Sequence, residues 1–424
     1  MSFVITRRTY FNPAEKALSL MRLGFRTGKG DDSDTSHETR SMYTILLYDE
    51  GAQGKTELGG GQLSRLSLME RLSKDFNPIL LTSENGVLAE EARKRGISVL
   101  VKNITESQNR FTRSELQASP HLAILSSLSL AKATIRLRQI IREIDPDIIH
   151  PNENLSRVLT VAATVGMDVP CVMHIDGEWD SSYIDALMRR LYVRSFDRLI
   201  AVSDEVGDAF GDDNRPANIQ TIYPGIELDR FENVGEPTEP LPNPDERLVL
   251  TSVGALIPIK GHETLLHALS GLDLEFVLYI VGTGPLKSYL ESLVRNLGIS
   301  DEVHFLGFRE DVPEIYAQTD IAVTPSLSEA FPRVVLEAMA SSIPVVASDV
   351  GGIGEAINDD RTGILVPPKN SDAFASAISN LAKDPDRRQR MGIAGRERVA
   401  ERFAFERGVE QVEAVYRDLI QSRG

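Results

Sequence analysis

The sequence predicts an α/β protein made of two Rossmann-like domains, each with a parallel sheet, that face each other across a cleft. The chain has 424 residues, more than a single hydrophobic core usually supports. Short, continuously apolar runs alternate with helical patterns, as expected of parallel strands that are buried on both faces. This alternation stops at a proline-rich stretch and then starts afresh, so we expect one domain on each side of it. Such folds bind ligands at the carboxyl ends of their strands, where the cleft would lie.

The composition is typical of a soluble globular protein, with 42% hydrophobic and 25% charged residues. The net charge of −16 argues against nucleic acid as a partner, because no basic excess is present to neutralise phosphates. The single cysteine, Cys171, excludes an intramolecular disulfide and a cysteine-cluster zinc site, and fits a reducing compartment. The sequence has no apolar run of bilayer length and no signal-peptide pattern at its start. We therefore expect a cytoplasmic protein, and leave peripheral contact with a membrane open.

Residues 1–41 differ in composition from the rest of the chain. Basic side chains dominate as far as Lys29, and the acidic, serine-rich piece DDSDTSHETR follows. We favour a disordered tail as the interpretation. One alternative is a short basic amphipathic helix over residues 13–25 that lies on an anionic membrane. Another is that Met42 is the natural start, because the first expected strand begins directly after it.

The first domain is predicted over residues 42–225. Its strands are expected at TILLY, FNPILLT, ISVLV, DIIH, VPCVMHI and DRLIAVS. Its helices are expected after the glycines at 59–61, at 88–95, at 122–144, after Asn154, and through Met188 and Tyr192. Strands that alternate with helices in this way form a parallel sheet covered on both faces.

Residues 226–247 are predicted to be a linker, since four prolines among acidic residues sustain neither a helix nor a central strand. The second domain, residues 248–400, repeats the alternation. Its strands are expected at RLVLTSVG, EFVLYIVG, VHFLG, DIAVTPS, PVVASD and GILVP. Residues 401–424 carry apolar side chains at helical spacing from Val409 to Leu419, so we expect a closing helix that crosses back.

The most informative stretch is residues 326–352, in which Glu329 and Glu337 stand eight positions apart. Proline favours the first helical turn, so a helix is expected to begin at Pro332. The free N–H groups at the positive end of this helix would form an anion site. They belong to Arg333, Val334 and Val335. Glu337 would lie one turn further on among apolar residues, where its charge needs a polar partner. The alternative is that both acids merely favour a helix N-terminus.

Lys260-Gly261 follows the first strand of the second domain, at the expected cleft. The lysine can bind a phosphate there as a compact point charge, although alone it resembles a surface lysine before a helix. Gly60 and Gly61 can likewise cradle a phosphate or serve as a hinge. Glycosidases use two carboxylates on a neutral acetal, whereas a helix N-terminus and a lysine favour an anionic leaving group such as a diphosphate. An activated sugar nucleotide is the substrate that fits this pattern best.

Polar residues follow two strands of the first domain, at His150 and Asn152 and at His174 and Asp176. Their place at the carboxyl ends of strands would let them hold an acceptor or sugar, although each could instead cap a helix. The seven histidines show no metal-ligand spacing, and no G-x-S-x-G nucleophile elbow is present. We therefore expect no metal site.

The segment SEAFPRVVLEAMASSIPVVASDVGGIGEAI resembles the E-x7-E region of the retaining glycosyltransferases of family 4, which have the GT-B fold. The resemblance continues through GGGQLSRLSLMERLS, DRLIAVSDEV, IYPGIELDRF, GALIPIKG, VGTGPL and HFLGFREDV, and covers nearly everything between residues 42 and 420. It implies that Glu337 binds the ribose hydroxyls of a nucleotide and that Glu329 binds the transferred sugar.

With this resemblance, the candidate residues fall into three sets. Beyond the two glutamates, the donor-binding set contains Lys260, Gly261, Phe308 and Arg309 beside the base, Phe331, the backbone near Arg333 and Val334 for the diphosphate, Gly60 and Gly61. The catalytic candidates are Glu329 and His150, and the acceptor-side candidates are Asn152, His174 and Asp176.

The resemblance also implies the chemistry. Such enzymes need no metal ion and retain the anomeric configuration, by same-face attack that the leaving phosphate assists. We therefore expect a hexosyltransferase without a cofactor, which uses a UDP- or GDP-sugar and a carbohydrate or lipid-linked acceptor. The alternatives are a nucleotide-sugar epimerase or phosphorylase-type enzyme of the same fold, and a non-catalytic binder of sugar nucleotides.

Two departures from the family pattern stand out. Many members have an arginine where this chain has Ala255, and a second histidine where it has Asn152. The loss of an arginine clamp on a phosphate removes charged hydrogen bonds worth about 1.5–3 kcal/mol. Arg333 and Arg309 are the candidates to replace it.

Overall fold

The computed structural model describes residues 42–50, 58, 60–105, 120–177, 183–210, 215–232, 234–239, 241–242 and 247–423. Residues 42–424 form one compact unit, separate from residues 1–41. The two predictions for residues 1–41, a tail or an amphipathic helix, lie outside the described residues. Within the described part, none of the helices is both long enough and apolar enough to cross a membrane.

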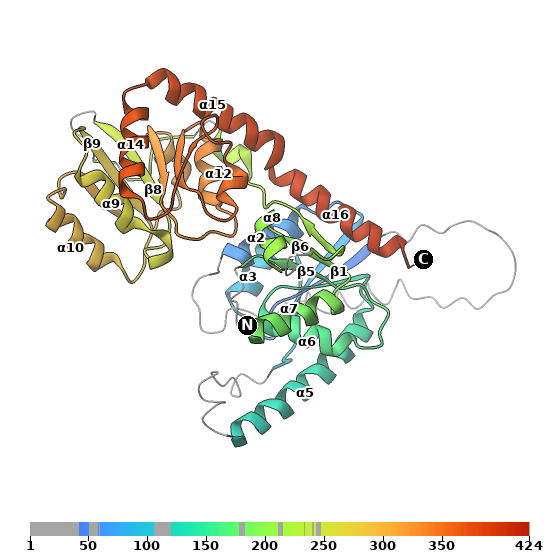
Figure 1. Cartoon of the computed structure of the whole chain (residues 1–424). Helices are drawn as coiled ribbons and strands as arrows, with labels where there is room; N and C mark the ends of the chain where they lie inside the picture. Colours follow the sequence, from blue (N-terminus) through green and yellow to red (C-terminus); the bar gives the residue numbers. More distant parts are fainter. Residues whose placement is uncertain are drawn as a thin grey trace, which may run out of the picture. The chain divides into compact units, whose positions relative to one another are not determined.

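The first half of the protein is built on parallel strands (Figure 1). Four of them pair in the order β3-β2-β1-β4, with bounds Tyr43–Tyr48 for β1, Phe76–Thr82 for β2, Ser98–Val101 for β3 and Ile148–Pro151 for β4. Three more pair in the order β5-β6-β7, with bounds Val172–Ile175, Arg198–Ala201 and Ile219–Thr221. A parallel bridge between Ile149 and Cys171 connects β4 to the second group.

Helices cover both faces of this half, and β1 shows why its sequence is apolar throughout. The helices are α2 (Gly60–Arg71), α3 (Val87–Lys94), α5 (Pro120–Ile144), α6 (Asn154–Thr164), α7 (Tyr183–Ser195) and α8 (Asp204–Phe210). Leu46 of β1 belongs to the buried cluster that contains residues of α5 and α6. The next residue, Leu47, belongs to the cluster that contains residues of α2 and α3. Successive side chains of a strand point to opposite faces, so both faces of β1 are buried.

The second half contains a six-stranded parallel sheet with the order β10-β9-β8-β11-β12-β13. The strands are β8 (Leu248–Val253), β9 (Phe276–Val281), β10 (Val303–Gly307), β11 (Ile321–Thr324), β12 (Val345–Ser348) and β13 (Ile364–Val366). The helices are α9 (His262–Ser270), α10 (Lys287–Leu297), α11 (Val312–Tyr316), α12 (Arg333–Ala340), α13 (Ile353–Ala356) and α14 (Ser371–Ala382). The strand order changes direction between β8 and β11, so the loops after these two strands meet at the switch point.

Two C-terminal helices complete the chain. The first, α15 (Pro385–Arg402), packs against α12 of the second half. The second, α16 (Phe405–Gln421), buries Val412 and Tyr416 in the same cluster as Ile45 and Leu47 of the first half. Between them, Ala404 forms a bridge with Ile226, near the end of the first half. The chain thus returns from the second half to the first (Figure 1).

The structure confirms the predicted fold class, with two Rossmann-like halves and a helix that returns to the first. Every expected strand is present. The short elements β7, α8 and α13 were not predicted, and neither were the longer helices α14 and α15. The helix expected from Pro332 begins at Arg333, with Pro332 as its N-cap. The predicted closing segment from residue 401 contains the end of α15 as well as α16. The domain boundaries at residues 225 and 248 stay predictions.

Candidate active site

Lys260 and Glu329 meet at the switch point of the second sheet. Lys260 ends a short 3-10 helix after β8, and Glu329 lies in the loop after β11. The Lys260 Nζ lies 2.5 Å from Glu329 Oε2, in a partly buried ion pair. Gly261 allows this approach, because it has a φ of 65° and any Cβ there would overlap the carbonyl oxygen of Pro325. Gly261 therefore allows the Lys260 ammonium and the Glu329 carboxylate to lie in contact.

Glu337 lies one turn into α12, half-buried, on a cleft of about 690 Å³. The lining residues include Leu63, Ser67 and Arg71 of α2, Arg230 of the 3-10 helix Leu228–Phe231, and Arg333 of α12. No group in the described part of the chain donates a hydrogen bond to its carboxylate, so the predicted protein partner is not found there. Burial raises the pKa of Glu337, and the charges of Arg333 and Arg230 offset only part of this effect. The cleft thus presents a carboxylate that is desolvated and still able to accept hydrogen bonds.

The N-terminus of α12 lies between Glu329 and Glu337 in the sequence. The N–H groups of Arg333, Val334 and Val335 precede the first helical bond, from the Leu336 N–H to the Pro332 carbonyl oxygen at 3.4 Å. N–H groups in the first turn have no intrahelical acceptor. The backbone is therefore suited to bind an anion, as predicted from the proline.

Phe331, a predicted donor-binding residue, is buried in an aromatic cluster. Its ring lies 5.4 Å from that of Tyr223 and 5.6 Å from that of Phe403, between centroids. Only 8% of the residue is exposed, so its side chain packs against the protein and leaves only the backbone for a ligand. Phe331 instead ties the loop of Glu329 to the start of α16.

The two residues predicted to border the base differ in their surroundings. Phe308 follows β10 and is 69% exposed, so its ring is free to stack on a ligand. Arg309 binds Asp311 through Nε at 2.7 Å and Nη2 at 2.5 Å, and only 8% of its side chain is exposed. Of the two candidates to replace the arginine missing at Ala255, Arg309 is the less suitable, since its Nε and Nη2 donors are already bonded to Asp311. Arg333 remains, because it lines the cleft beside Glu337.

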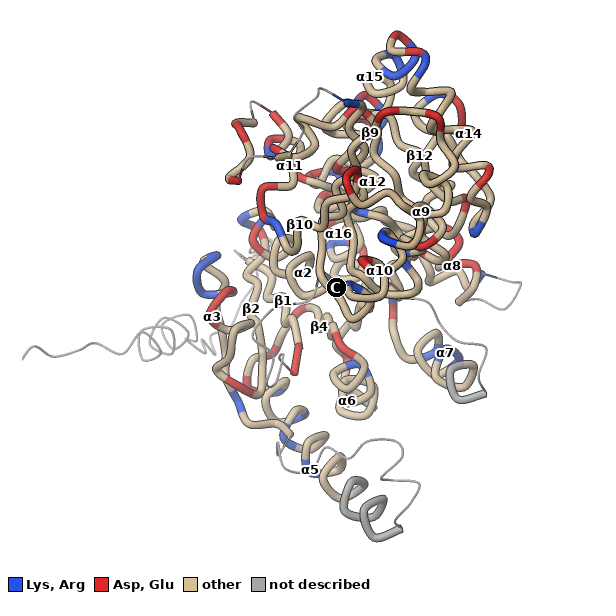
Figure 2. Tube along the Cα trace, turned by 90° about the vertical axis from the view of Figure 1, so that its left-hand side faces the viewer, with Lys and Arg blue, Asp and Glu red and all other residues tan. Residues whose placement is uncertain are grey.

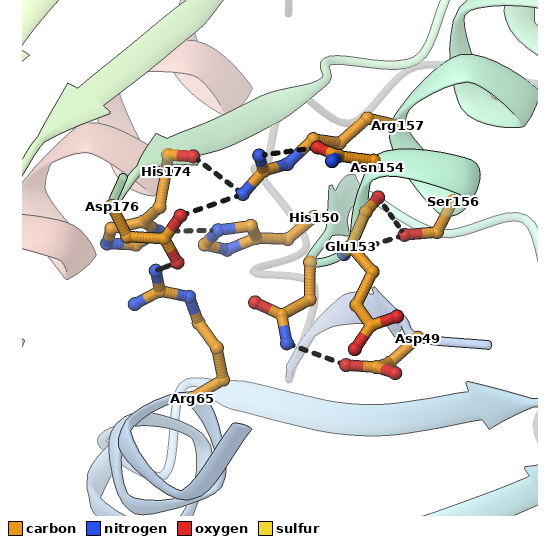
Figure 3. Close-up of polar contacts among 10 residues, drawn as sticks. Asp49, Arg65, His150, Glu153, Asn154, Ser156, Arg157, His174 and Asp176 are labelled. Atoms are coloured by element: carbon orange, nitrogen blue, oxygen red, sulfur yellow. Dashed lines mark hydrogen bonds and ion pairs between the residues drawn. The ribbon is translucent and has the colours of Figure 1, made fainter. Parts of the chain in front are cut away.

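In the first half, His150 and His174 form a buried chain with Tyr416 of α16. The His150 Nδ1 lies 2.7 Å from the Tyr416 hydroxyl. The His150 Nε2 lies 2.7 Å from the Nδ1 of His174 (Figure 3). The two imidazole rings are stacked, with 2° between their planes. Burial, aided by Arg65 and Arg157, lowers the pKa of both histidines well below the usual value. Both rings are therefore neutral at neutral pH.

The hydrogen bonds among Tyr416, His150 and His174 indicate which ring nitrogens of the two histidines carry a proton. The Tyr416 hydroxyl is fully buried, and among the described residues its partner is His150. If it accepted a proton from His150, its own O–H would be left unpaired at a cost of about 1–3 kcal/mol. Tyr416 therefore donates to His150, which donates from Nε2 to His174. His174 then carries its proton on Nε2.

Asp176 is held between two buried arginines. Its Oδ2 lies 3.1 Å from Arg65 Nη2 and its Oδ1 lies 3.1 Å from Arg157 Nη2 (Figure 3). Although burial raises the pKa of Asp176, the charges of Arg65 and then Arg157 outweigh it, and the pKa lies below its usual value. Asn152 donates to Asp49 at 2.6 Å. These contacts fix the polar residues at the carboxyl ends of β1, β4 and β5.

A pocket of about 390 Å³ opens above these residues. It is lined by Gly61, Gln62, Asn152, Glu153, Asn154, Leu155, Arg157 and Asp176. Three predicted residues thus share one pocket, namely Gly61 in the first turn of α2, Asn152 and Asp176. Gly60 begins α2 beside them. His150 is 0% exposed and His174 is 5% exposed, so they lie in the core rather than on this pocket.

Several residues of the site were not predicted. Asp49 follows β1 as His150 ends β4, so the rule that selects polar residues at the carboxyl ends of strands could have found it. Arg65, Arg157 and Tyr416 lie on helices, where a buried polar side chain and a solvated one look alike in sequence. Arg230 carried no signal, because its position opposite α12 depends on how the chain folds back.

Comparisons with known proteins agree with this architecture. Residues 86–230 match the family model Glycosyltransferase Family 4, and residues 236–398 match Glycosyl transferases group 1. A D-inositol 3-phosphate glycosyltransferase of Kribbella flavida is 30% identical over 322 residues, which cover 68% of this chain and 75% of that protein. A D-inositol 3-phosphate glycosyltransferase 2 of Catenulispora acidiphila is 33% identical over 261 residues, 57% and 58% of the two chains. The matched part of the chain spans 52–58% of the length of the first three curated relatives.

Solved structures share the fold at lower identity. HepE of Anabaena, in complex with UDP, has a TM-score of 0.71 at 21% identity, over 89% of this chain and all of that chain. Sucrose-phosphate synthase of Thermosynechococcus elongatus has a TM-score of 0.73 at 22% identity, over 90% and 100%. The chain therefore belongs to the family 4 glycosyltransferases and has their GT-B fold.

Proposed function

We propose that this protein transfers a hexose from a nucleotide-diphosphate sugar to a carbohydrate or lipid-linked acceptor, with retention of configuration and without a metal ion. The observation that carries the proposal is the Glu337 carboxylate, desolvated on the cleft and without a hydrogen-bond donor in the described chain. A ribose supplies two neighbouring hydroxyl donors to such a group. Family membership supports the same role for this residue.

In this proposal the diphosphate binds between Lys260 and the first turn of α12. The Nζ of lysine has three donors, so Lys260 can keep its bond to Glu329 and still bind a phosphate oxygen. Arg333 then supplies the charge that Ala255 does not. Glu329, held by Lys260, is oriented to accept hydrogen bonds from the hydroxyls of the transferred sugar, and Phe308 borders the base.

The proposed reaction needs no nucleophile from the enzyme. The bond between the anomeric carbon and the diphosphate oxygen breaks, and the acceptor oxygen bonds to the same face of that carbon. The acceptor proton passes to the departing phosphate oxygen. Asp176 is a poor proton acceptor, because Arg65 and Arg157 bind its carboxylate and keep its pKa low. Its role in this proposal is to shape the acceptor pocket together with Gly61 and Asn152.

His150 takes a different role from the one predicted. A fully buried ring whose two nitrogens are both bonded does not reach a substrate. We assign it as a positioning residue that connects α16 to His174. Glu329 remains the catalytic candidate, next to the reacting sugar.

UDP is the first donor nucleotide to test, and GDP the second. HepE has been crystallised with UDP and with UDP-glucose, and it shares the fold of this chain. We would measure binding and turnover of UDP-, GDP- and ADP-sugars by calorimetry and product analysis, with and without a chelator. Turnover should survive the chelator, because Lys260 and the α12 N-terminus hold the diphosphate.

The decisive variant is Lys260→Ala. The loss of a charged hydrogen bond worth about 1.5–3 kcal/mol should raise the donor KM roughly tenfold or more. Lys287→Ala, at an exposed position of α10, is the control and should leave KM unchanged. An unchanged donor KM in Lys260→Ala would show that the donor site has been misplaced.

The alternatives differ in their products. A transferase releases free nucleotide and forms a new glycoside, an epimerase isomerises the donor, and a phosphorylase forms a sugar phosphate. A non-catalytic binder would retain sugar nucleotides without any turnover. Ala255 is the feature that favours this last alternative.

A further inference from the structure

The acceptor pocket offers no uncommitted cation among its described lining residues. Arg157 is the basic residue on its wall, and 7% of its side chain is exposed. Its Nη2 donates to the His174 carbonyl oxygen and to Asp176, both at 3.1 Å, and its Nη1 donates to Asn154 Oδ1 at 3.4 Å. Its Nε is buried and has no hydrogen-bond partner among the described residues. Both Nη groups of Arg157 are therefore bonded within the protein.

Carboxylates and amides make up the rest of the polar wall. Glu153 is the residue before α6, and the chain there is drawn as an acidic segment between β4 and α6 (Figure 2). Asp176 contributes a second carboxylate, which is 30% exposed as a side chain. Asn152 and Gln62 add amide groups, and both donate to Asp49, a third carboxylate just below. Such a wall accepts hydrogen bonds from hydroxyl groups and repels phosphate.

We infer that the acceptor group bound in this pocket is an uncharged, hydroxyl-rich one, such as an unphosphorylated sugar or polyol. The inference rests on the proposed function and specifies its substrate class. It also separates this protein from relatives whose names specify an inositol phosphate. A phosphate in the pocket would lie beside Glu153, and the one arginine on the described part of the wall, Arg157, is already paired with Asp176.

The test compares matched acceptors with the purified full chain and its best donor. The pairs are myo-inositol with its monophosphate, glucose with glucose 6-phosphate, and a disaccharide with its phosphate ester. We expect kcat/KM for the neutral member of the productive pair to exceed that for the phosphorylated member by at least tenfold. Equal or faster transfer to a phosphorylated member would overturn the inference and leave the proposed transferase intact.

Glu153→Gln probes the origin of the preference. Because the substitution removes one negative charge from the wall, the ratio of phosphorylated to neutral kcat/KM should rise at least threefold, and less at high salt. Glu143→Gln, at an exposed position of α5, is the matched control and should leave the ratio unchanged. A ratio that Glu153→Gln does not move would contradict the electrostatic argument. If no neutral member of any pair is glycosylated, the inference fails, whereas transfer to a lipid-linked sugar in the same assay would leave the proposed transferase intact.

Discussion

Glu337 shows how a single residue can be costly for stability and valuable for binding. Its charge is half-buried without a bonded partner in the described chain, and burial raises its pKa. An unpaired carboxylate in such a place lowers the free energy of unfolding, because the charged form loses its hydration on folding. Function explains why the residue is tolerated, since a ribose would supply the missing donors.

Glu337→Gln should therefore separate stability from binding. At pH 7 the melting temperature should stay the same or rise, while the donor Kd should increase roughly tenfold or more as a charged hydrogen bond is lost. In the unsubstituted protein, donor affinity should fall as the pH drops through the raised pKa, and Glu337→Gln should flatten this dependence. Calorimetric titration from pH 7.5 to 5 measures both effects. Glu397→Gln on α15 is the exposed control, and a matching loss of affinity there would refute the assignment.

His262, the residue after Gly261, is a second buried polar residue without a hydrogen-bond partner in the described structure. It is 3% exposed, and neither ring nitrogen has a hydrogen-bond partner within the described structure. Burial, followed by the charge of Lys260, lowers its pKa to about 4. The folded state therefore holds His262 neutral, whereas the unfolded chain protonates near pH 6.5.

This difference predicts how stability depends on pH. Above pH 6.5, His262 is neutral in the folded and in the unfolded chain, so it does not lower the free energy of unfolding. As the pH falls towards 4, the unfolded chain binds the proton while the folded state does not, and the free energy of unfolding decreases by about 3 kcal/mol in total. His262→Gln should weaken the decline in melting temperature between pH 6.5 and 5. His267→Gln, an exposed histidine of the same helix, should not. Equal slopes for the two variants would exclude His262 as the source.

At the scale of elements, α16 has two functions. Its apolar face buries Val409, Val412 and Tyr416 against the first half, and each buried aliphatic side chain contributes roughly 1.5–3 kcal/mol. Its Tyr416 hydroxyl reaches the core and ends the chain of histidines. The helix therefore packs on the first half and also fixes the protons of His150 and His174.

Tyr416→Phe removes this hydroxyl and keeps the ring. The Nδ1 of His150 loses its donor in the core, so the free energy of unfolding should fall by about 1–3 kcal/mol. The tautomer preference should also relax, which ¹⁵N NMR of the histidine rings detects directly. Tyr289→Phe removes an exposed bond to Glu263 and should change neither quantity. Unchanged ring tautomers in Tyr416→Phe would contradict the proton assignment.

At the scale of the whole molecule, the two halves are joined by a shared hydrophobic cluster and by specific polar contacts. Glu355 of α13 accepts hydrogen bonds from the N–H groups of Asp204 and Glu205, at 2.9 and 3.0 Å, and so caps α8 of the first half. Tyr223, Phe331 and Phe403 form the aromatic cluster beside it. The loop that carries Glu329 is part of this junction through Phe331. We therefore expect closure of the halves to be coupled to donor binding, with the linker and α16 as the hinge.

Small-angle scattering tests this coupling. A donor nucleotide should reduce the radius of gyration, and Glu355→Ala should increase it in the free protein because α8 loses its cap. The same variant should lower the free energy of unfolding by about 0.5–2 kcal/mol. Glu410→Ala, exposed on α16, is the control. No compaction with nucleotide would argue against closure.

The sequence alone predicted the fold and the neighbourhood of Lys260, Glu329 and the start of α12. Continuous apolar strands, one proline-rich break and the helix at Pro332 are local features, so local physics is enough to interpret them. The meeting of Lys260 with Glu329 followed from the same rule, because both follow strands at the switch point.

Tertiary structure decided which polar residues line the cleft or the pocket. Arg309 and Arg333 are equivalent in sequence, but Asp311 engages the first and the cleft receives the second. His150 and Asp176 both follow strands of the first half, but α16 covers His150 and leaves Asp176 on the pocket. The partner of Arg309 is only two residues away, whereas His150 is covered by Tyr416 at a separation of 266 residues. Periodicity and motif spacing contain no information on such contacts, so only the folded chain could settle these roles.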